Sequence, residues 1–134
     1  MSDNTDVIKG AYDAFGSGDI PAVLGILDER VEWDVTTVVP QGGSWRGRDA
    51  VGEFFQNLGE KWSELKVEPE QYVADDDTVI VIGRAAGRLR GHNDAAAGYT
   101  FVHGFKLTGG QVTRFREWAD PDQELAGHMS HGEH

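Results

Sequence analysis

The order of the periodic segments along the chain restricts its fold more than any other feature. Apolar residues recur at helical spacing in three segments before residue 60, and a short strand-like segment lies between the second and the third. From residue 67 onward, segments that read as strands are separated by short turn sequences. An order of helix, helix, strand, helix and then an antiparallel meander is typical of the α+β class.

Each of the three expected helices has a recognisable start. Asn4 or Thr5 serves as the N-cap of the first, Asp19 of the second and Asp49 of the third, because these side chains accept hydrogen bonds from free backbone N–H groups. The helices are expected to cover residues 4–16, residues 19 to 28 or 29, and residues 49–58.

The first strand is expected at Val31, where Val31, Trp33 and Val35 alternate with polar residues. The remaining strands are expected over residues 67–74, 79–90, 99–107 and 112–120. Residues 40–47 contain three glycines and one proline, which predicts a loop, and Trp45 is unusually large and apolar for such a setting.

Composition and charge exclude several classes of protein. A chain of 134 residues fits one domain. Its formal net charge of −11 argues against binding a nucleic-acid backbone, which requires basic side chains. No apolar run approaches the roughly 18 residues of a membrane span, and the acidic, polar start is unlike a signal peptide. Because the chain has no cysteine, a cytoplasmic protein without disulfides is expected.

The two ends of the chain carry a family resemblance. The N-terminal helical pattern runs into Gly18-Asp19-Ile20 and Val31-Glu32-Trp33, and the C-terminal strand reads Gly109-Gly110-Gln111-Val112-Thr113-Arg114-Phe115-Arg116-Glu117-Trp118-Ala119-Asp120. Together they resemble the SnoaL-like branch of the NTF2-like superfamily. The resemblance implies an α+β cone in which three N-terminal helices pack on a strongly curved antiparallel sheet around one pocket. Residues 1–125 are expected to form this domain and residues 126–134 a flexible tail.

Comparison with the ketosteroid isomerases, which belong to the same superfamily, argues against their reaction. An ungapped count places their tyrosine donor at Ala11, their catalytic base at Val35 and their protonated aspartate at His103. Because proton transfer between carbons needs a base within reach of the substrate, steroid isomerisation is not expected. Tyr12 and Asp34 lie one residue away and are expected to point elsewhere, unless a one-residue gap in the flanking loops restores them.

His103 is the strongest catalytic candidate because it is the one ionisable residue in an apolar alternating row. Its acidic partner depends on the hairpin at residues 108–111. A two-residue Gly-Gly turn places Arg116, Trp118 and Asp120 on the His103 face, whereas a three-residue loop with a bulge places Glu117 there. Both arrangements remain open, and in SnoaL-like cyclases the acid/base residue lies near the end of this strand. The catalytic candidates are therefore His103, Asp120 and Glu117.

The pocket wall is expected to be largely aromatic and apolar. Arg84 is the mid-strand arginine that best imitates the arginine of limonene-type epoxide hydrolases, which share the fold. The candidate substrate-binding residues are Trp33, Val35, Trp45, Phe54, Arg84, Phe101, Arg116 and Trp118. The expected ligand is a small hydrophobic, ring-bearing or polyketide-like molecule, converted by cofactor-free acid/base chemistry of the cyclase, isomerase or hydrolase type. The alternative is a non-catalytic module that binds a small ligand or serves only in dimerisation.

Two further expectations concern partners and metals. The alternating apolar residues Val79, Val81, Ala85 and Leu89 predict a homodimer through the outer face of the meander. The histidines near the C-terminus, His128, His131 and His134 with Glu133, are interpreted as part of a flexible tail, so no functional metal site is expected.

Overall fold

Three helices come before the long strands, as the periodicity predicted. In the computed structural model, which describes residues 3–131, they are α1 (Asn4–Gly16), α2 (Ile20–Gly25) and α3 (Arg48–Lys61). The Asp3 carboxylate caps α1 by accepting a hydrogen bond from the Asp6 N–H, so the cap lies just before Asn4. Asp19 caps α2 as expected. Gly47, rather than Asp49, holds the cap position of α3.

Six strands form one sheet in the order β2-β1-β6-β5-β4-β3. They are β1 (Leu27–Val35), β2 (Gly43–Arg46), β3 (Trp62–Asp75), β4 (Thr78–Leu89), β5 (Ala95–Thr108) and β6 (Gln111–Pro121). Neighbouring strands are antiparallel except β1 and β6, which pair in parallel. α2 ends earlier than predicted because β1 already begins at Leu27, and part of the predicted loop forms β2, where Trp45 pairs with Trp33.

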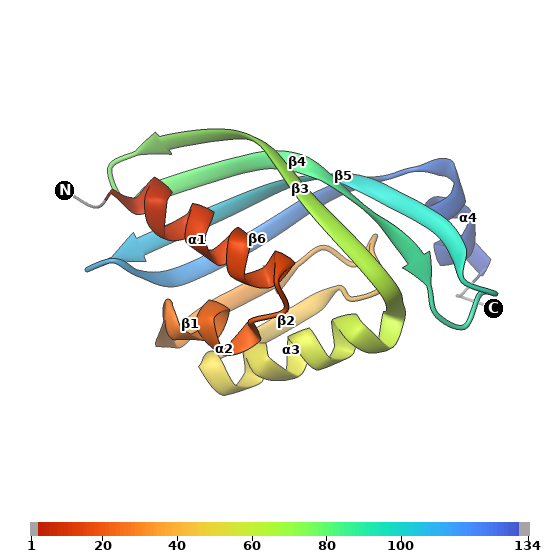
Figure 1. Ribbon diagram of the computed structural model, residues 1–134, viewed down its shortest axis with the longest axis horizontal. Helices are drawn as coiled ribbons and strands as arrows, with labels where there is room; N and C mark the ends of the chain where they lie inside the picture. Colours follow the sequence, from red (N-terminus) through yellow and green to blue (C-terminus); the bar gives the residue numbers. More distant parts are fainter. Residues whose placement is uncertain (1–2, 132–134) are drawn as a thin grey trace.

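The sheet curves around helices that lie on one of its faces (Figure 1). A register shift between Pro69 and Gln71 interrupts the pairing of β3 with β4 beside Gly83. A Cβ on Gly83 would collide with the backbone of β3 and would lie 2.7 Å from Cζ of Phe101. Glycine therefore allows β3 to approach closely while the Phe101 ring occupies the concave side.

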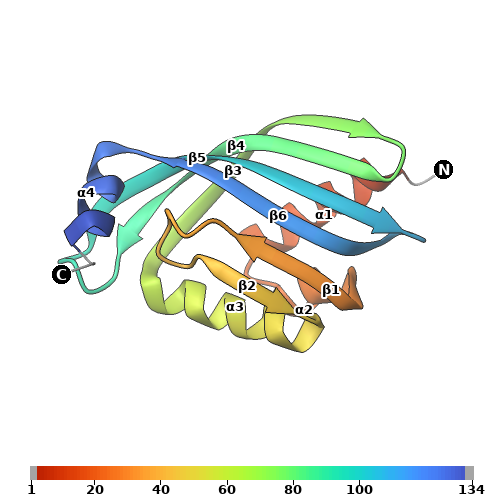
Figure 2. The same cartoon turned by 180° about the vertical axis from the view of Figure 1, so that it is seen from behind.

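The two faces of the sheet differ in what covers them. α1, α2 and α3 cover the concave face, whereas none of the described helices crosses the opposite, convex face (Figure 2). Val79, Val81, Ala85 and Leu89, which the sequence had suggested for an outer dimer surface, are all at most 2% exposed in the core. They point to the concave side because their strand alternates in phase with Phe101 and His103.

The chain ends in a fourth helix, α4 (Gln123–His131), at one end of the sheet (Figure 1). Leu125 is fully buried, and α4 includes residues 126–131, which were expected in the tail. Residues 132–134, including Glu133 and His134 of the predicted histidine-rich tail, lie outside the described residues. Among the side chains that the structure describes, no three His, Asp or Glu residues gather to hold a metal ion. No helix within residues 3–131 is long and apolar enough to span a membrane.

Candidate functional site

The hairpin between β5 and β6 determines which acid faces His103. Its turn has two residues, Gly109 and Gly110, both with positive φ, and Thr108 pairs with Gln111. Leu107 then pairs with Val112, but Lys106 pairs with Arg114, so Thr113 is an extra residue in β6. The turn is therefore the two-residue form. Glu117 nevertheless faces His103, as expected for the longer loop, because the bulge shifts β6 by one residue and exchanges its two faces.

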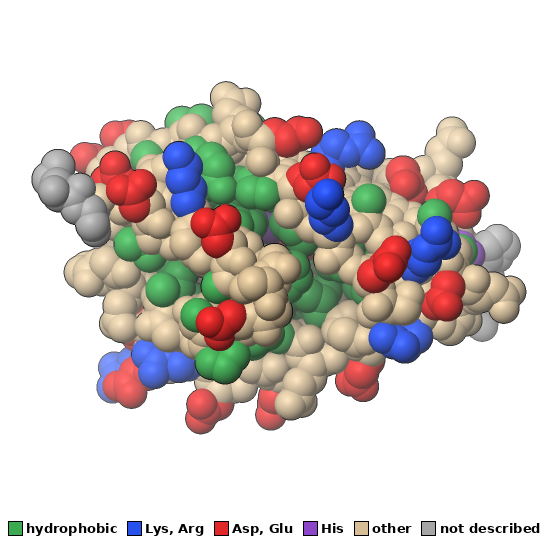
Figure 3. Space-filling view, viewed as in Figure 1, with side chains coloured by type: hydrophobic (Ala, Val, Ile, Leu, Met, Phe, Trp, Pro, Cys, Tyr) green, Lys and Arg blue, Asp and Glu red, His purple; other side chains and the backbone are tan. Residues whose placement is uncertain are grey.

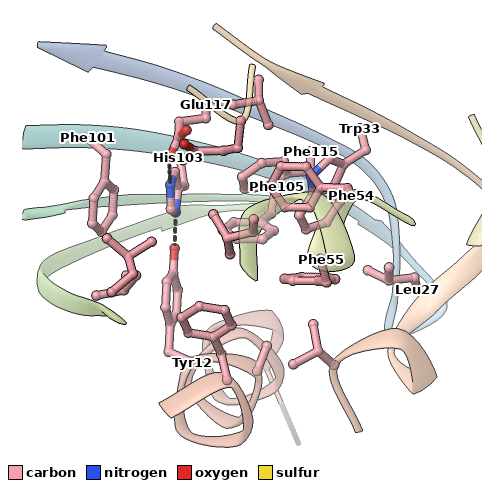
Figure 4. A pocket seen from close by; sticks show the side chains of 18 of the residues that line it. Tyr12, Leu27, Trp33, Phe54, Phe55, Phe101, His103, Phe105, Phe115 and Glu117 are labelled. Atoms are coloured by element: carbon pink, nitrogen blue, oxygen red, sulfur yellow. Dashed lines mark hydrogen bonds and ion pairs between the residues drawn. The ribbon is translucent and has the colours of Figure 1, made fainter. Parts of the chain in front are cut away.

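This register places Glu117 directly opposite His103 on the concave face. The His103 Nε2 atom lies 2.5 Å from Oε2 of Glu117, and the two residues are only 7% and 6% exposed. The other ring nitrogen, Nδ1, lies 2.5 Å from the hydroxyl oxygen of Tyr12 on α1. Tyr12, His103 and Glu117, called the triad below, form a continuous hydrogen-bonded chain from the helix layer to the sheet (Figure 4).

The hydrogen bonds of His103 have two arrangements, which differ by one added proton. A Glu117 carboxylate can only accept, so it accepts the Nε2–H bond of His103. Nδ1 of a neutral ring then accepts the Tyr12 O–H bond. In an imidazolium ring, Nδ1–H donates to the Tyr12 oxygen, and the tyrosine proton is free to reach another acceptor. The triad can therefore take up or release one proton without moving a heavy atom.

Burial raises the pKa of Tyr12 well above its ordinary value, and the nearby Tyr72 and Glu117 side chains add to the rise. The phenol consequently stays protonated near neutral pH. Tyr12 was expected to turn away from the site, but both Ala11 and Tyr12 line the cavity. The cavity extends far enough around α1 to meet two successive helical residues, which the one-position rotation argument did not allow for.

The site lies in a cavity of about 90 Å³ between the helices and the concave face of the sheet. Figure 3 shows hydrophobic side chains gathered around the middle of the corresponding face of the molecule. Six residues predicted for the site line this cavity: Trp33, Val35, Phe54, Phe101, His103 and Glu117. The rings of Phe101 and His103 stack with centroids 3.9 Å apart, so an aromatic face orients the imidazole.

The other predicted site residues lie outside the cavity. Trp45 packs edge-on against Phe54, with ring centroids 4.8 Å apart, from its position on β2. Four more residues are exposed on the convex face: Arg84, Arg116, Trp118 and Asp120. The Arg116 guanidinium lies over the Trp118 ring, 5.1 Å from its centroid, and does not line the cavity. Strand alternation, combined with the bulge at Thr113, turns Arg116, Trp118 and Asp120 away from His103.

Asp34 faces the convex side, as its strand position predicted. Its Oδ1 accepts hydrogen bonds from Ser44 Oγ at 2.7 Å and from Arg46 Nη1 at 3.2 Å. Partial burial works to raise the pKa of Asp34, but these hydrogen bonds and the Arg46 charge outweigh it and lower the pKa. The carboxylate therefore belongs to the β1–β2 surface and not to the cavity.

A second polar group lines the cavity and was not found from the sequence. Gln41, only 2% exposed, donates from Nε2 to the Tyr99 hydroxyl oxygen at 3.0 Å and accepts the Trp62 indole N–H at 3.0 Å. Burial raises the pKa of Tyr99, and the charge of Glu117 raises it further. No local signal marks Gln41, because it lies in a glycine-rich and proline-containing stretch that sequence patterns describe only as a loop.

Comparison with known proteins yields a family match and several similar folds. The family model described as SnoaL-like domain matches residues 8–115. An NTF2-like protein of unknown function from Burkholderia pseudomallei is 24% identical, with 97% of each chain covered and a TM-score of 0.84. A putative SnoaL-like polyketide cyclase from Jannaschia sp. is 20% identical, covering 87% of this chain and 85% of that one, with a TM-score of 0.76. TerC, co-crystallised with polyporic acid, is 23% identical, with 93% and 95% covered and a TM-score of 0.79. No curated protein sequence matches the chain.

Proposed function

The chain belongs to the SnoaL-like domain family, and we propose that it carries out cofactor-free acid/base catalysis on a small hydrophobic, ring-bearing molecule. The observation that supports this most is the chain of hydrogen bonds from Tyr12 through His103 to Glu117 inside an apolar cavity. A histidine that is hydrogen-bonded to both a carboxylate and a phenol can act as a general acid or base. In this proposal His103 carries the proton, Glu117 stabilises its charged form and Tyr12 contacts the substrate.

The reaction begins with a neutral His103 ring whose Nε2–H bond is directed to Glu117. As a substrate C–H or O–H bond breaks, the Tyr12 oxygen accepts that proton and passes its own proton to Nδ1 of His103. Imidazolium and substrate anion form together, and Glu117 stabilises the imidazolium. Reversal of the relay returns the proton to a different substrate atom, so atoms and charges balance over the cycle. An isomerisation or an intramolecular cyclisation requires no other reagent.

The surroundings of the triad favour a neutral substrate. The cavity wall is almost entirely aliphatic and aromatic, and within the described residues no lysine or arginine lines it. In such a medium the attraction between Glu117 and a positive His103 ring is stronger than in water, since few water dipoles screen it. The negative charge of Glu117 would repel an anionic substrate, and no lysine or arginine among the described lining residues would offset that repulsion.

The cavity volume favours small rings over the extended polyketides first considered. A cavity of about 150 Å³ in another protein takes up benzene, and the cavity here measures about 90 Å³. A single ring therefore already requires some outward movement of the lining side chains. TerC was co-crystallised with polyporic acid, and the Jannaschia protein is a putative polyketide cyclase. Both are similar in fold and support the interior of this fold as a site for small molecules.

A second candidate function is ligand binding without turnover. One observation favours it, because both ring nitrogens of His103 already have partners, as they would in a purely structural network. The two candidates differ in whether the proton of the triad exchanges with a bound ligand.

The deciding experiment measures deuterium incorporation into bound cyclic ketones. Cyclopentanone, cyclohexanone and 2-indanone are titrated by NMR to establish binding, and exchange at their α-carbons is then followed in buffered D₂O. Acid/base catalysis predicts exchange above the buffer rate, reduced by about 10²-fold or more in His103→Gln. Asp120→Asn is the matched control, since this carboxylate is on the same strand but on the convex face. Bound ketones that exchange no faster than in buffer would favour the binding module.

We also propose a homodimer formed through the convex face. Ile82 and Trp118 are 37% and 47% exposed, and Val102 lies between them in register, so an apolar row crosses three strands. Large exposed apolar groups arranged in this way are typical of protein interfaces. This row replaces the buried β4 residues that the sequence had suggested.

A further inference from the structure

The indole nitrogen of Trp33 stands apart from the other polar atoms of the core. Among the described residues, it is the one buried side-chain nitrogen or oxygen without a hydrogen-bond partner. Trp33 is 5% exposed and lines the cavity. An indole N–H can only donate, and buried donors are nearly always satisfied. Trp62 follows that rule, because its indole donates to Gln41.

The residues packed against Trp33 offer no conventional acceptor. Its ring stacks on Phe115 at a centroid distance of 3.9 Å, and Phe54 and Phe55 lie at 5.6 and 5.9 Å. Figure 4 shows the indole among these aromatic side chains in the cavity wall. An oxygen atom that completes the hydrogen bonding of this N–H can come from a water or a ligand in the cavity that Trp33 lines.

Trp33 and the acid/base triad occupy separate positions along the cavity. On β1, Val35 pairs with Glu117, whereas Trp33 pairs with Phe115, two residues away along both strands. His103 lies beyond Glu117 on β5. A ligand can thus meet the donor of Trp33 with one atom and the Tyr12–His103 end with another.

We infer that Trp33 is a positioning residue that donates its indole N–H to an oxygen of the ligand. The ligand is then a small, uncharged cyclic molecule that carries a carbonyl or ether oxygen away from the atom that loses its proton. This inference rests on the proposed function only in taking the cavity as the ligand site. It specifies the orientation of the ligand, which the triad alone does not.

The test compares two probes of nearly equal shape, cyclohexanone and methylenecyclohexane, in which a carbonyl oxygen is replaced by a CH₂ group. Their dissociation constants are measured by NMR titration, and the ratio of the two removes the general difference in hydrophobicity when variants are compared. Trp33→Phe should shift this ratio by about tenfold toward methylenecyclohexane, as expected for loss of one hydrogen bond. Trp45→Phe is the matched control, because Trp45 also packs on Phe54 but does not line the cavity.

A measurement on the unmodified protein covers the case in which Trp33→Phe fails to fold. In a ¹⁵N-labelled sample, the Trp33 indole proton should move downfield with cyclohexanone and not with methylenecyclohexane. The Trp62 indole, which is already bonded to Gln41, is the internal reference and should move little. An indole shift that is the same for both probes would overturn the inference.

Two outcomes separate this inference from the proposed function. A ratio that changes in Tyr12→Phe but not in Trp33→Phe would assign the ligand oxygen to Tyr12 and overturn the role of Trp33. Deuterium exchange that depends on His103 would remain intact in that case. Conversely, a ratio that depends on Trp33 without any exchange would support the positioning role in a binding module.

Discussion

Glu117 faces His103 because of Thr113, a residue that contacts neither of them in the hydrogen-bonded chain. Thr113 is the extra residue that shifts β6 by one position between Lys106 and Leu107 of β5. Without this shift, continuing the pairing of Thr108 with Gln111 would place Arg116, rather than Glu117, on the concave face opposite the His103 row. A bulge close to the turn therefore determines which β6 side chain faces His103 further along the strand.

Deleting Thr113 should remove the bulge without changing which residues of β6 face the cavity. In the shortened strand the pair Lys106–Arg114 directly follows the pair Leu107–Val112, so Phe115 and Glu117, which are 4% and 6% exposed, stay on the concave face. We expect the free energy of unfolding, measured by urea denaturation, to change by less than about 2 kcal/mol. Thr113→Val keeps the bulge and is the control. A deletion variant that loses more than about 4 kcal/mol would contradict the register assigned to β6.

Glu117→Gln should separate the charge of Glu117 from its hydrogen bond. The amide can still accept from His103 Nε2–H but no longer stabilises a positive ring. If the triad moves a proton, deuterium exchange of a bound ketone should fall by about 10²-fold while the dissociation constant of the ketone changes little. An exchange rate that the substitution leaves unchanged would show that Glu117 has only a structural role.

The tyrosines should resist ionisation until the protein unfolds. Burial raises the pKa of Tyr12, Tyr72 and Tyr99, and these are all three tyrosines of the chain. Because an unfolded tyrosine ionises near pH 10, the stability linked to these raised values is present below that pH and is lost above it. Absorbance at 295 nm should show little phenolate at pH 10, and the free energy of unfolding should fall as the pH rises further.

Tyr12→Phe provides the control for this alkaline dependence. The variant lacks one of the buried phenols, so its stability should fall less steeply above pH 10 than that of the unaltered protein. Full phenolate absorbance at pH 10 in folded protein would be inconsistent with the buried positions of Tyr12 and Tyr99.

Gly83→Ala should test the close approach of β3 to β4. The added methyl group would meet the β3 backbone and the Phe101 ring, which lies 2.7 Å from the Cβ position. We expect a destabilisation of about 1–3 kcal/mol in thermal or urea unfolding. Gly10→Ala on α1 is the matched control, because nothing lies within 4 Å of its Cβ position and helix propensity favours alanine. A Gly83→Ala variant with an unchanged free energy of unfolding would mean that the sheet tolerates a wider spacing of β3 and β4.

Trp118→Ser combined with Ile82→Ser should weaken the proposed dimer. The double variant removes the apolar row on the convex face, so sedimentation equilibrium should show the monomer at concentrations where the unaltered protein is dimeric. Val38→Ser is the control, since Val38 is 41% exposed but lies outside the strands. A protein that is monomeric before any substitution would rule out this interface.

Local patterns in the sequence determined the class of fold and most of its elements. Apolar spacing and capping residues located α1 and α2, and alternation located the long strands, because these signals depend on neighbours a few residues apart. The same patterns, together with the family resemblance, indicated His103 and much of the aromatic wall. No local pattern predicted the parallel pairing of β1 with β6, since it joins segments that are distant in the sequence.

Only the tertiary structure decided which groups meet in the cavity. Of the two acids that the sequence left open, Glu117 and not Asp120 is the partner of His103, because one bulged residue reverses the faces of a strand. Tyr12 reaches His103 across 91 positions of the sequence, and Gln41 reaches Tyr99 across 58. The missing partner of Trp33 Nε1 is likewise visible only once every neighbour is placed. Contacts of this kind depend on register and on the packing of helices against the sheet, and no periodicity within a single segment encodes them.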